Sequence, residues 1–231
     1  PRYLRLAVGS LLNDTPGEKV DIRRITVSTT PPQGFSAKGE PEIPFISAPI
    51  WAISDGTNGE LLGGDGVDMP AKIASIAKVM TAYIVCQLSA RDPKVLDEII
   101  TGTAASQATR GSSSCLPEGD SLPVRDALYA MMLPSGNDIG VLLADHFASR
   151  LAAPETPLPS VPVERRNFIA EMNRQAKALG MSSTTYRHPF GDGGSLEDRT
   201  STPRDLLILG RAAMGNALFK KVVGTAHYAA V

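Results

Sequence analysis

Residues 74–85 read ASIAKVMTAYIV and predict the central helix of the fold. This run and its continuation to residue 90 are apolar on most sides, and Asp92-Pro93 ends the pattern. A helix that is apolar nearly all round is a buried helix. We therefore expect a helix over residues 75–90 that forms the spine of the protein.

This predicted helix begins with a serine and a lysine three residues apart, Ser75 and Lys78. One helical turn places the two side chains on the same face. The Ser75 hydroxyl then lies in the positive field of the helix N-terminus. A lysine held against it and partly desolvated loses basicity, so that its neutral form can accept a proton. The pair predicts a nucleophile with its own base, although alone it also fits a helix cap beside a solvated lysine.

A second polar motif, Ser135-Gly136-Asn137, follows further along the chain. We expect it at a junction between a helix over residues 123–133 and a new helix from residue 138 to about residue 150. Such a junction holds polar side chains on a tight turn that faces the cleft. The alternative for Ser135 and Asn137 is an N-cap and turn pair for the following helix, and the two interpretations are compatible.

Other segments predict a hairpin, two helices and a loop. The hairpin is expected over residues 49–64, with its turn at residues 55–59, DGTNG. Amphipathic helices are expected over residues 163–180 and 203–214. The proline-rich stretch 153–162 is expected to be a surface loop.

Composition narrows the class of protein. The chain has 231 residues, 42% of them hydrophobic and 20% charged, so it can bury a substantial core and is not typical of a disordered protein. Its formal net charge of −1 gives no reason to expect a nucleic-acid partner. No apolar run approaches the length of a membrane span.

Neither a disulfide nor a metal site is expected. Cys86 lies on the predicted central helix and Cys115 falls in a loop, so a bridge between them, which an oxidising compartment would allow, is disfavoured. The histidines, His146, His188 and His227, match no zinc-binding spacing with these cysteines. The sequence implies no cofactor.

Five blocks of sequence that surround both polar motifs, from about residue 50 to residue 228, resemble the D-alanyl-D-alanine carboxypeptidases. These are the low-molecular-mass penicillin-binding proteins of peptidase family S11. The blocks are WAISDGTNGELL, ASIAKVMTAYIV, LPEGDSLPVRDALYAMMLPSGNDIGVLLADH, MNRQAKALGMSSTTYRHPFG and STPRDLLILGRAAM. Ser-x-x-Lys followed by a Ser-x-Asn motif is the pattern of this superfamily.

The resemblance implies an α/β fold of the β-lactamase/transpeptidase type, with an antiparallel sheet flanked by helices and a helical subdomain. Residues 1–45 would be an N-terminal extension of unassigned role, with strand-like alternation in VDIRRITVST, and residues 46–231 the catalytic domain. The family's third motif, Lys-Thr-Gly, is absent, and FKKVVGTAHYAAV resembles the stretch before it. We expect the sequence to stop before the last strands, leaving a sheet edge that a missing segment, a second chain or a swapped copy covers.

The resemblance also implies a serine-type carboxypeptidase that removes the terminal D-alanine from peptidoglycan stem peptides ending in D-Ala-D-Ala, with β-lactams as covalent inhibitors. Ser75 would be the nucleophile, Lys78 its base and Ser135 the proton relay to the leaving amine. The Ser75 backbone N–H and the Asn137 side chain would bind the substrate, and Asn137 would also orient Lys78. Such proteins are exported to the periplasm or cell envelope, with any membrane anchor outside this sequence, so that Pro1 would begin a mature or trimmed form.

Two other functions remain open at this point. A class A-like β-lactamase shares the serine–lysine pair but needs a glutamate to activate water, for which Glu164 and Glu171 are the candidates. Both fall on a predicted helix that the carboxypeptidase pattern explains. A catalytically degenerate penicillin-binding scaffold protein would keep the fold and lack the third motif. Repeated turnover of penicillin would indicate the first function, and an unreactive Ser75 the second.

Overall fold

The computed structural model describes residues 46–191 and 201–229, so the predictions for residues 1–45 fall outside the described residues. The chain separates into two compact units, Pro1–Met69 and Pro70–Val231.

The described part of the first unit is a β-hairpin, in which β1 (Trp51–Ser54) pairs antiparallel with β2 (Leu61–Asp65). Its turn is held by Asp55, whose Oδ1 accepts hydrogen bonds from the backbone N–H groups of Thr57 at 2.6 Å and Asn58 at 3.1 Å. An aspartate that bonds the backbone two residues on is a standard turn former. The hairpin predicted from DGTNG is therefore confirmed.

The second unit is mostly helical and contains a small antiparallel sheet of β3 and β4. Its elements in chain order are η1 (Ala74–Ile76), α1 (Ala77–Arg91), η2 (Pro93–Asp97), β3 (Ile99–Thr101), α2 (Ala104–Gln107), β4 (Ser121–Pro123), α3 (Val124–Met132), α4 (Asn137–Ala148), η3 (Val163–Arg165), α5 (Arg166–Leu179), α6 (Pro203–Met214) and α7 (Ala217–Val223). Each predicted helix is present: α6 has the predicted ends, and the ends of the others are shifted by up to three residues. The strands in the described ranges form two separate two-stranded sheets.

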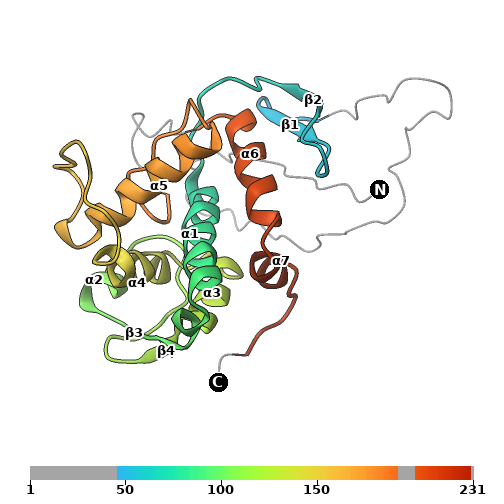
Figure 1. Cartoon of the computed structure of the whole chain (residues 1–231). Coiled ribbons are helices and arrows are strands. Elements are labelled where there is room, and N and C mark those ends of the chain that lie inside the picture. Colours follow the sequence, from blue (N-terminus) through green and yellow to red (C-terminus); the bar gives the residue numbers. More distant parts are fainter. Residues whose placement is uncertain (1–45, 192–200, 230–231) are drawn as a thin grey trace, which may run out of the picture. The chain divides into compact units, whose positions relative to one another are not determined.

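Helix α1 is the centre of the second unit and packs against α3, α4, α5, α6 and α7 (Figure 1). Most of its side chains are buried, which confirms the predicted spine of the fold. Its buried apolar side chains include Met80 and Val85, which are each 0% exposed. Three polar side chains, Lys78, Thr81 and Ser89, are buried on the same helix, and buried polar groups need hydrogen-bond partners.

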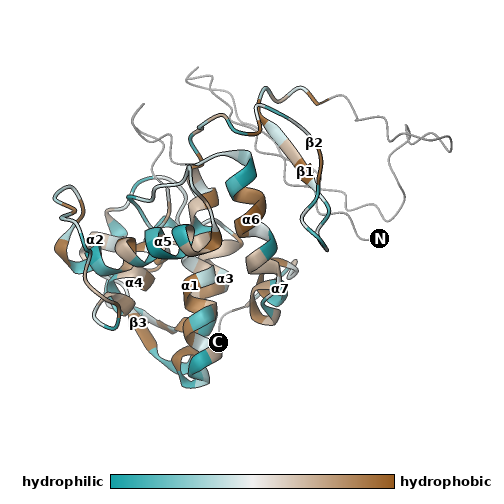
Figure 2. Cartoon of the chain, turned by 45° about the horizontal axis from the view of Figure 1, so that its top comes forward, coloured by the Kyte–Doolittle hydropathy of each residue, from teal (hydrophilic) through white to brown (hydrophobic). Residues whose placement is uncertain are grey.

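Helices α5 and α6 are amphipathic, as their sequences predict. Around α6, hydrophobic and hydrophilic residues form distinct bands (Figure 2). Helix α5 buries Phe168, Ile169, Met172 and Ala176, which recur at helical spacing along one side. It ends at Gly180, whose left-handed φ of 83° is the usual way to close a helix.

Glu98 ties the start of β3 to the end of α4. Its carboxylate accepts two hydrogen bonds from the Arg150 guanidinium, at 2.7 and 2.6 Å, and lies 2.7 Å from His146 Nε2. The hydrogen bonds from Arg150 outweigh the opposing effect of burial, and together with the contact to His146 they lower the pKa of Glu98 from 4.5 to about 2.

Glu98→Gln is expected to reduce the free energy of unfolding most strongly at neutral pH. A carboxylate whose pKa is lowered in the folded state stabilises the fold above its unfolded pKa, and that stabilisation is lost as the pH falls through the folded pKa. The difference from wild type should therefore shrink as the pH is lowered from about 4.5 towards about 2, measured by urea unfolding. Exposed Glu118→Gln is the control, and a difference that did not vary with pH would contradict the assignment.

Candidate active site

Ser75 lies in the short 3-10 turn η1 that leads into α1, and its side chain is exposed. The preceding residue, Ala74, has a left-handed φ of 41°, which is uncommon for a residue other than glycine. The helix proper begins at Ala77, two residues later than the sequence predicts. This turn places the Ser75 hydroxyl at the N-terminal end of α1.

Lys78 is buried beneath Ser75, with only 2% of its surface exposed. Its Nζ is 2.9 Å from Ser75 Oγ and 3.2 Å from Ser135 Oγ, and it donates a further hydrogen bond of 3.2 Å to the carbonyl oxygen of Phe190. The structure thus brings Ser75, Lys78 and Ser135 within hydrogen-bond distance, from two motifs that lie far apart in the sequence.

Burial lowers the pKa of Lys78 from 10.5 to about 8, although the negative charge of Asp138 opposes this change. About one Lys78 side chain in ten is then neutral at neutral pH. A neutral amine beside two hydroxyl groups can accept a proton from one and pass it to the other. The arrangement therefore supplies a base for a serine nucleophile without a histidine.

Ser135 lies on the turn between α3 and α4 and has a left-handed φ of 64°. The next residue, Gly136, is packed tightly, because a Cβ there would lie 2.7 Å from the carbonyl oxygen of Ala130. The turn is thus fixed by its backbone. It places the Ser135 hydroxyl 3.2 Å from Lys78 Nζ.

Asn137 is the first residue of α4 and is 8% exposed. Its Nδ2 donates a 2.7 Å hydrogen bond to the carbonyl oxygen of Arg110, and its backbone N–H donates to that of Ser112. Its Oδ1 is buried, and in the described part of the chain it has no hydrogen-bond partner. We expected Asn137 to orient Lys78. In the described residues, however, the hydrogen bonds of Lys78 Nζ go to Ser75, Ser135 and Phe190.

The next residue, Asp138, binds a loop that sequence reasoning left without a role. Its carboxylate accepts hydrogen bonds from Ser113 Oγ at 2.9 Å, from Ser114 Oγ at 2.8 Å and from the Ser114 backbone N–H. Burial raises the pKa of Asp138, but the hydrogen bonds from Ser114 and Ser113 outweigh burial and leave the pKa below its ordinary value. The signal in the sequence is the run of serines at residues 112–114, whose hydroxyl groups can donate hydrogen bonds to a carboxylate.

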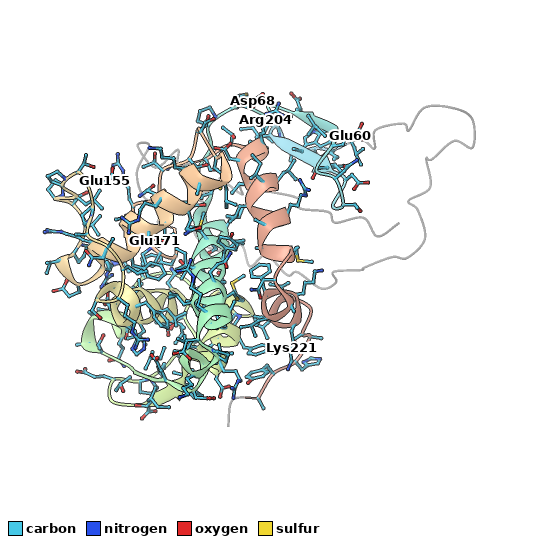
Figure 3. The ribbon with its side chains drawn as sticks, viewed as in Figure 1. Glu60, Asp68, Glu155, Glu171, Arg204 and Lys221 are labelled. Carbon is cyan, nitrogen blue, oxygen red and sulfur yellow. The ribbon has the colours of Figure 1, made fainter. Side chains whose placement is uncertain are left out.

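The two glutamates of the β-lactamase alternative lie elsewhere. Glu171 is on α5 (Figure 3). Its carboxylate accepts hydrogen bonds from Arg174 at 2.8 Å and Gln175 at 2.6 Å. Glu164 is exposed on η3. Over residues 46–191 and 201–229, neither glutamate is hydrogen-bonded to Ser75.

The sequence also led to expectations about the cysteines, metal binding and membrane spans. Cys86 is buried on α1 and Cys115 is exposed in a loop, and both are free thiols. Within the described residues, no group of three or more histidine, cysteine, aspartate or glutamate side chains is arranged to hold a metal ion. No helix in the same residues is both long and apolar enough to span a bilayer.

The family model of the D-alanyl-D-alanine carboxypeptidases, peptidase family S11, matches residues 37–230. The chain therefore belongs to this family. The match includes both polar motifs and the 3-10 turn, helix and loop that hold them. The recognition made from the five sequence blocks is confirmed.

Curated relatives agree with this assignment. The chain is 33% identical over 187 residues to D-alanyl-D-alanine carboxypeptidase DacC of Escherichia coli, a match that covers 78% of this chain and 43% of the relative. It is 32% identical over 209 residues to a D-alanyl-D-alanine carboxypeptidase of Streptomyces, which covers 89% of this chain and 65% of the relative. The chain thus spans between about two fifths and two thirds of the length of these relatives.

Solved structures resemble the fold. The crystal structure of the Streptomyces K15 DD-transpeptidase matches with a TM-score of 0.65 and 31% identity, covering 80% of this chain and 67% of that chain. The D-alanyl-D-alanine carboxypeptidase DacD from Francisella tularensis matches with a TM-score of 0.65 and 26% identity, covering 80% of this chain and 42% of that one. The predicted β-lactamase/transpeptidase-type fold is confirmed, and the two small sheets are consistent with an incomplete sheet.

Proposed function

We propose that the protein is a serine-type D-Ala-D-Ala carboxypeptidase, which removes the terminal D-alanine from peptidoglycan stem peptides. The observation that carries the proposal is the buried Lys78 amine, within hydrogen-bond distance of both Ser75 and Ser135. Membership of the family supports the substrate class, because the relatives above are named for this activity.

In the proposed reaction, Ser75 Oγ attacks the carbonyl carbon between the two D-alanines, while neutral Lys78 takes the hydroxyl proton. The oxyanion that forms is held by the Ser75 backbone N–H at the start of the helix. The peptide C–N bond then breaks, and the proton passes through Ser135 to the nitrogen of the departing D-alanine. An ester between Ser75 and the rest of the stem peptide remains.

Asn137 would align the substrate. Its buried Oδ1 accepts no hydrogen bond in the described part of the chain. A buried polar atom without a partner reduces the stability of the fold. Substrate binding would have to uncover this buried oxygen before an amide N–H of the stem peptide could donate a hydrogen bond to it, while the hydrogen bond from Nδ2 to the Arg110 carbonyl oxygen keeps the side-chain amide from rotating. Substrate binding thus replaces a missing hydrogen bond.

Water then hydrolyses the ester and frees Ser75. A β-lactam presents a strained amide to the same hydroxyl and would acylate it, so that β-lactams act as covalent inhibitors. Among the described residues, the two candidate glutamates are not hydrogen-bonded to Ser75, since Glu171 is bonded to Arg174 and Gln175 and Glu164 is exposed on η3. Neither is in place to speed hydrolysis of that adduct, as a class A β-lactamase requires. The adduct should therefore persist.

The proposal extends to location and assembly. We expect the protein to act outside the cytoplasm, in the periplasm or cell envelope, where this substrate class is found. The strands β1 and β2 form a two-stranded sheet with exposed Leu61 and Leu62, which are 40% and 42% exposed. We propose that a further segment, a second chain or a swapped copy completes this sheet, since unpaired strand edges associate.

The test is acylation of the full-length protein by penicillin, followed by intact-mass spectrometry. We expect one covalent adduct on the wild type and on exposed Ser160→Ala, and none on Ser75→Ala, together with release of D-alanine from a peptide ending in D-Ala-D-Ala. Absence of an adduct on the wild type would favour a degenerate scaffold protein. Rapid loss of the adduct with many turnovers would favour a β-lactamase.

A further inference from the structure

Residues 189–191, Pro-Phe-Gly, cross α1 beside the lysine, and two side chains of that helix hold them. Thr81 Oγ1 donates a hydrogen bond to the carbonyl oxygen of Pro189, and Lys78 Nζ donates one to that of Phe190. Lys78 and Thr81 are three residues apart and therefore share a face of α1. Thr81 is 0% exposed, so this hydrogen bond is shielded from water.

Two further close approaches confine the same segment. A Cβ on Gly140 of α4 would lie 3.2 Å from Phe190 Cβ, so that helix and segment are already in contact. Gly191 has a left-handed φ of 75°, and a Cβ there would lie 1.8 Å from the carbonyl oxygen of Ala74, the residue before Ser75. The segment is thus packed between α1, α4 and the turn that carries Ser75.

The Phe190 carbonyl has a consequence for the state of Lys78. A carbonyl oxygen can only accept a hydrogen bond, whereas a neutral amine has two N–H donors and one lone pair. With one N–H committed to Phe190, the other N–H and the lone pair are left for the hydroxyls of Ser75 and Ser135. The Phe190 carbonyl therefore sets the rotation of the Lys78 amino group about the Cε–Nζ bond.

We propose that Thr81 is a positioning residue for the reaction proposed above. By fixing the Pro189 carbonyl, it holds the adjacent Phe190 carbonyl where that group directs Lys78 Nζ at both serines. The inference rests on the proposed function. The alternative is that the Thr81 hydroxyl only satisfies a buried carbonyl, which would affect stability but not the chemistry at Ser75.

The test compares Thr81→Val, which keeps the shape and removes the hydroxyl, with Thr81→Ser, which keeps the hydroxyl. Ser89→Ala is the matched control, because Ser89 is also buried on α1 but bonds only to Cys86 within that helix. The probe is a fluorescent penicillin, and the readout is the acylation rate of the full-length protein as a function of pH. Thermal melting shows that each variant is folded at the assay temperature.

We expect Thr81→Val to lower the plateau acylation rate about tenfold or more, since small displacements of reacting groups are costly. The midpoint of the rise in rate with pH should also move lower, because the Lys78 ammonium loses an acceptor while Asp138, the charge that acts on it, is unchanged. Thr81→Ser should restore most of the rate, and Ser89→Ala should keep it.

The outcomes separate this inference from the proposed function. A wild type that penicillin does not acylate would overturn the proposed function. If penicillin acylates the wild type, and Thr81→Val has the same plateau rate and the same midpoint, only the role of Thr81 is overturned. An equal fall in rate for Thr81→Val and Ser89→Ala would also overturn it, because the loss would then follow from helix stability alone.

Discussion

Lys78→Met in the full-length protein is expected to slow acylation by penicillin about a thousandfold or more, the scale of a lost general base. Methionine has a similar length and suits a buried position, so the fold should survive. It leaves the Ser75 hydroxyl without the amine now 2.9 Å away. The measurement is the second-order acylation rate by intact-mass spectrometry, with thermal melting as a check on folding.

The control for this variant is Lys177→Met, which removes an exposed lysine from α5 and should acylate as the wild type does. The pH dependence supplies a second check. In the proposed mechanism the neutral amine is the base, so the wild-type rate should rise through a pH of about 8 and then level off. A Lys78→Met protein that reacted within tenfold of the wild type would exclude Lys78 as the base.

Gly191→Ala is expected to lower the acylation rate about a hundredfold, because a displacement of about 1 Å at reacting groups costs that much. Its Cβ would lie 1.8 Å from the Ala74 carbonyl oxygen, so either residues 189–191 or the turn before Ser75 must move. The left-handed φ of 75° adds a cost of about 1–2 kcal/mol for any residue with a Cβ. Both stability and acylation should fall.

A matched control separates these two effects. Gly180 has a similar left-handed φ of 83°, but a Cβ there meets no atom within 4 Å. Gly180→Ala should therefore lose stability from the backbone term alone and retain its acylation rate. If both glycine variants acylated equally fast, close packing at Gly191 would have no part in positioning Ser75.

Features that depend on short stretches of sequence were predicted well. The helix around residues 77–91 follows from a continuous apolar run, and the contact of Lys78 with Ser75 follows from a spacing of one turn. The start of that helix was placed too early, because a left-handed residue at Ala74 and a 3-10 turn leave no signature in hydrophobic periodicity.

Features that join distant parts of the chain were missed. Lys78 and Phe190 are 112 residues apart, and Ser114 and Asp138 are 24 residues apart. A single sequence does not reveal which polar groups meet across such separations, because packing decides it. The contact of Ser135 with Lys78, 57 residues apart, was expected only through the family resemblance.

Ala74, which precedes Ser75, and Ser135 itself have left-handed backbone conformations, and these link the stability of the protein to the proposed chemistry. Each stores conformational energy of about 1–3 kcal/mol that the surrounding packing must offset. If the backbone at either residue relaxed, the free energy of unfolding would rise and the hydroxyl of Ser75 or Ser135 would move away from the Lys78 amine. Changes that relax the backbone at these two positions are therefore expected to raise thermal stability and to lower the acylation rate.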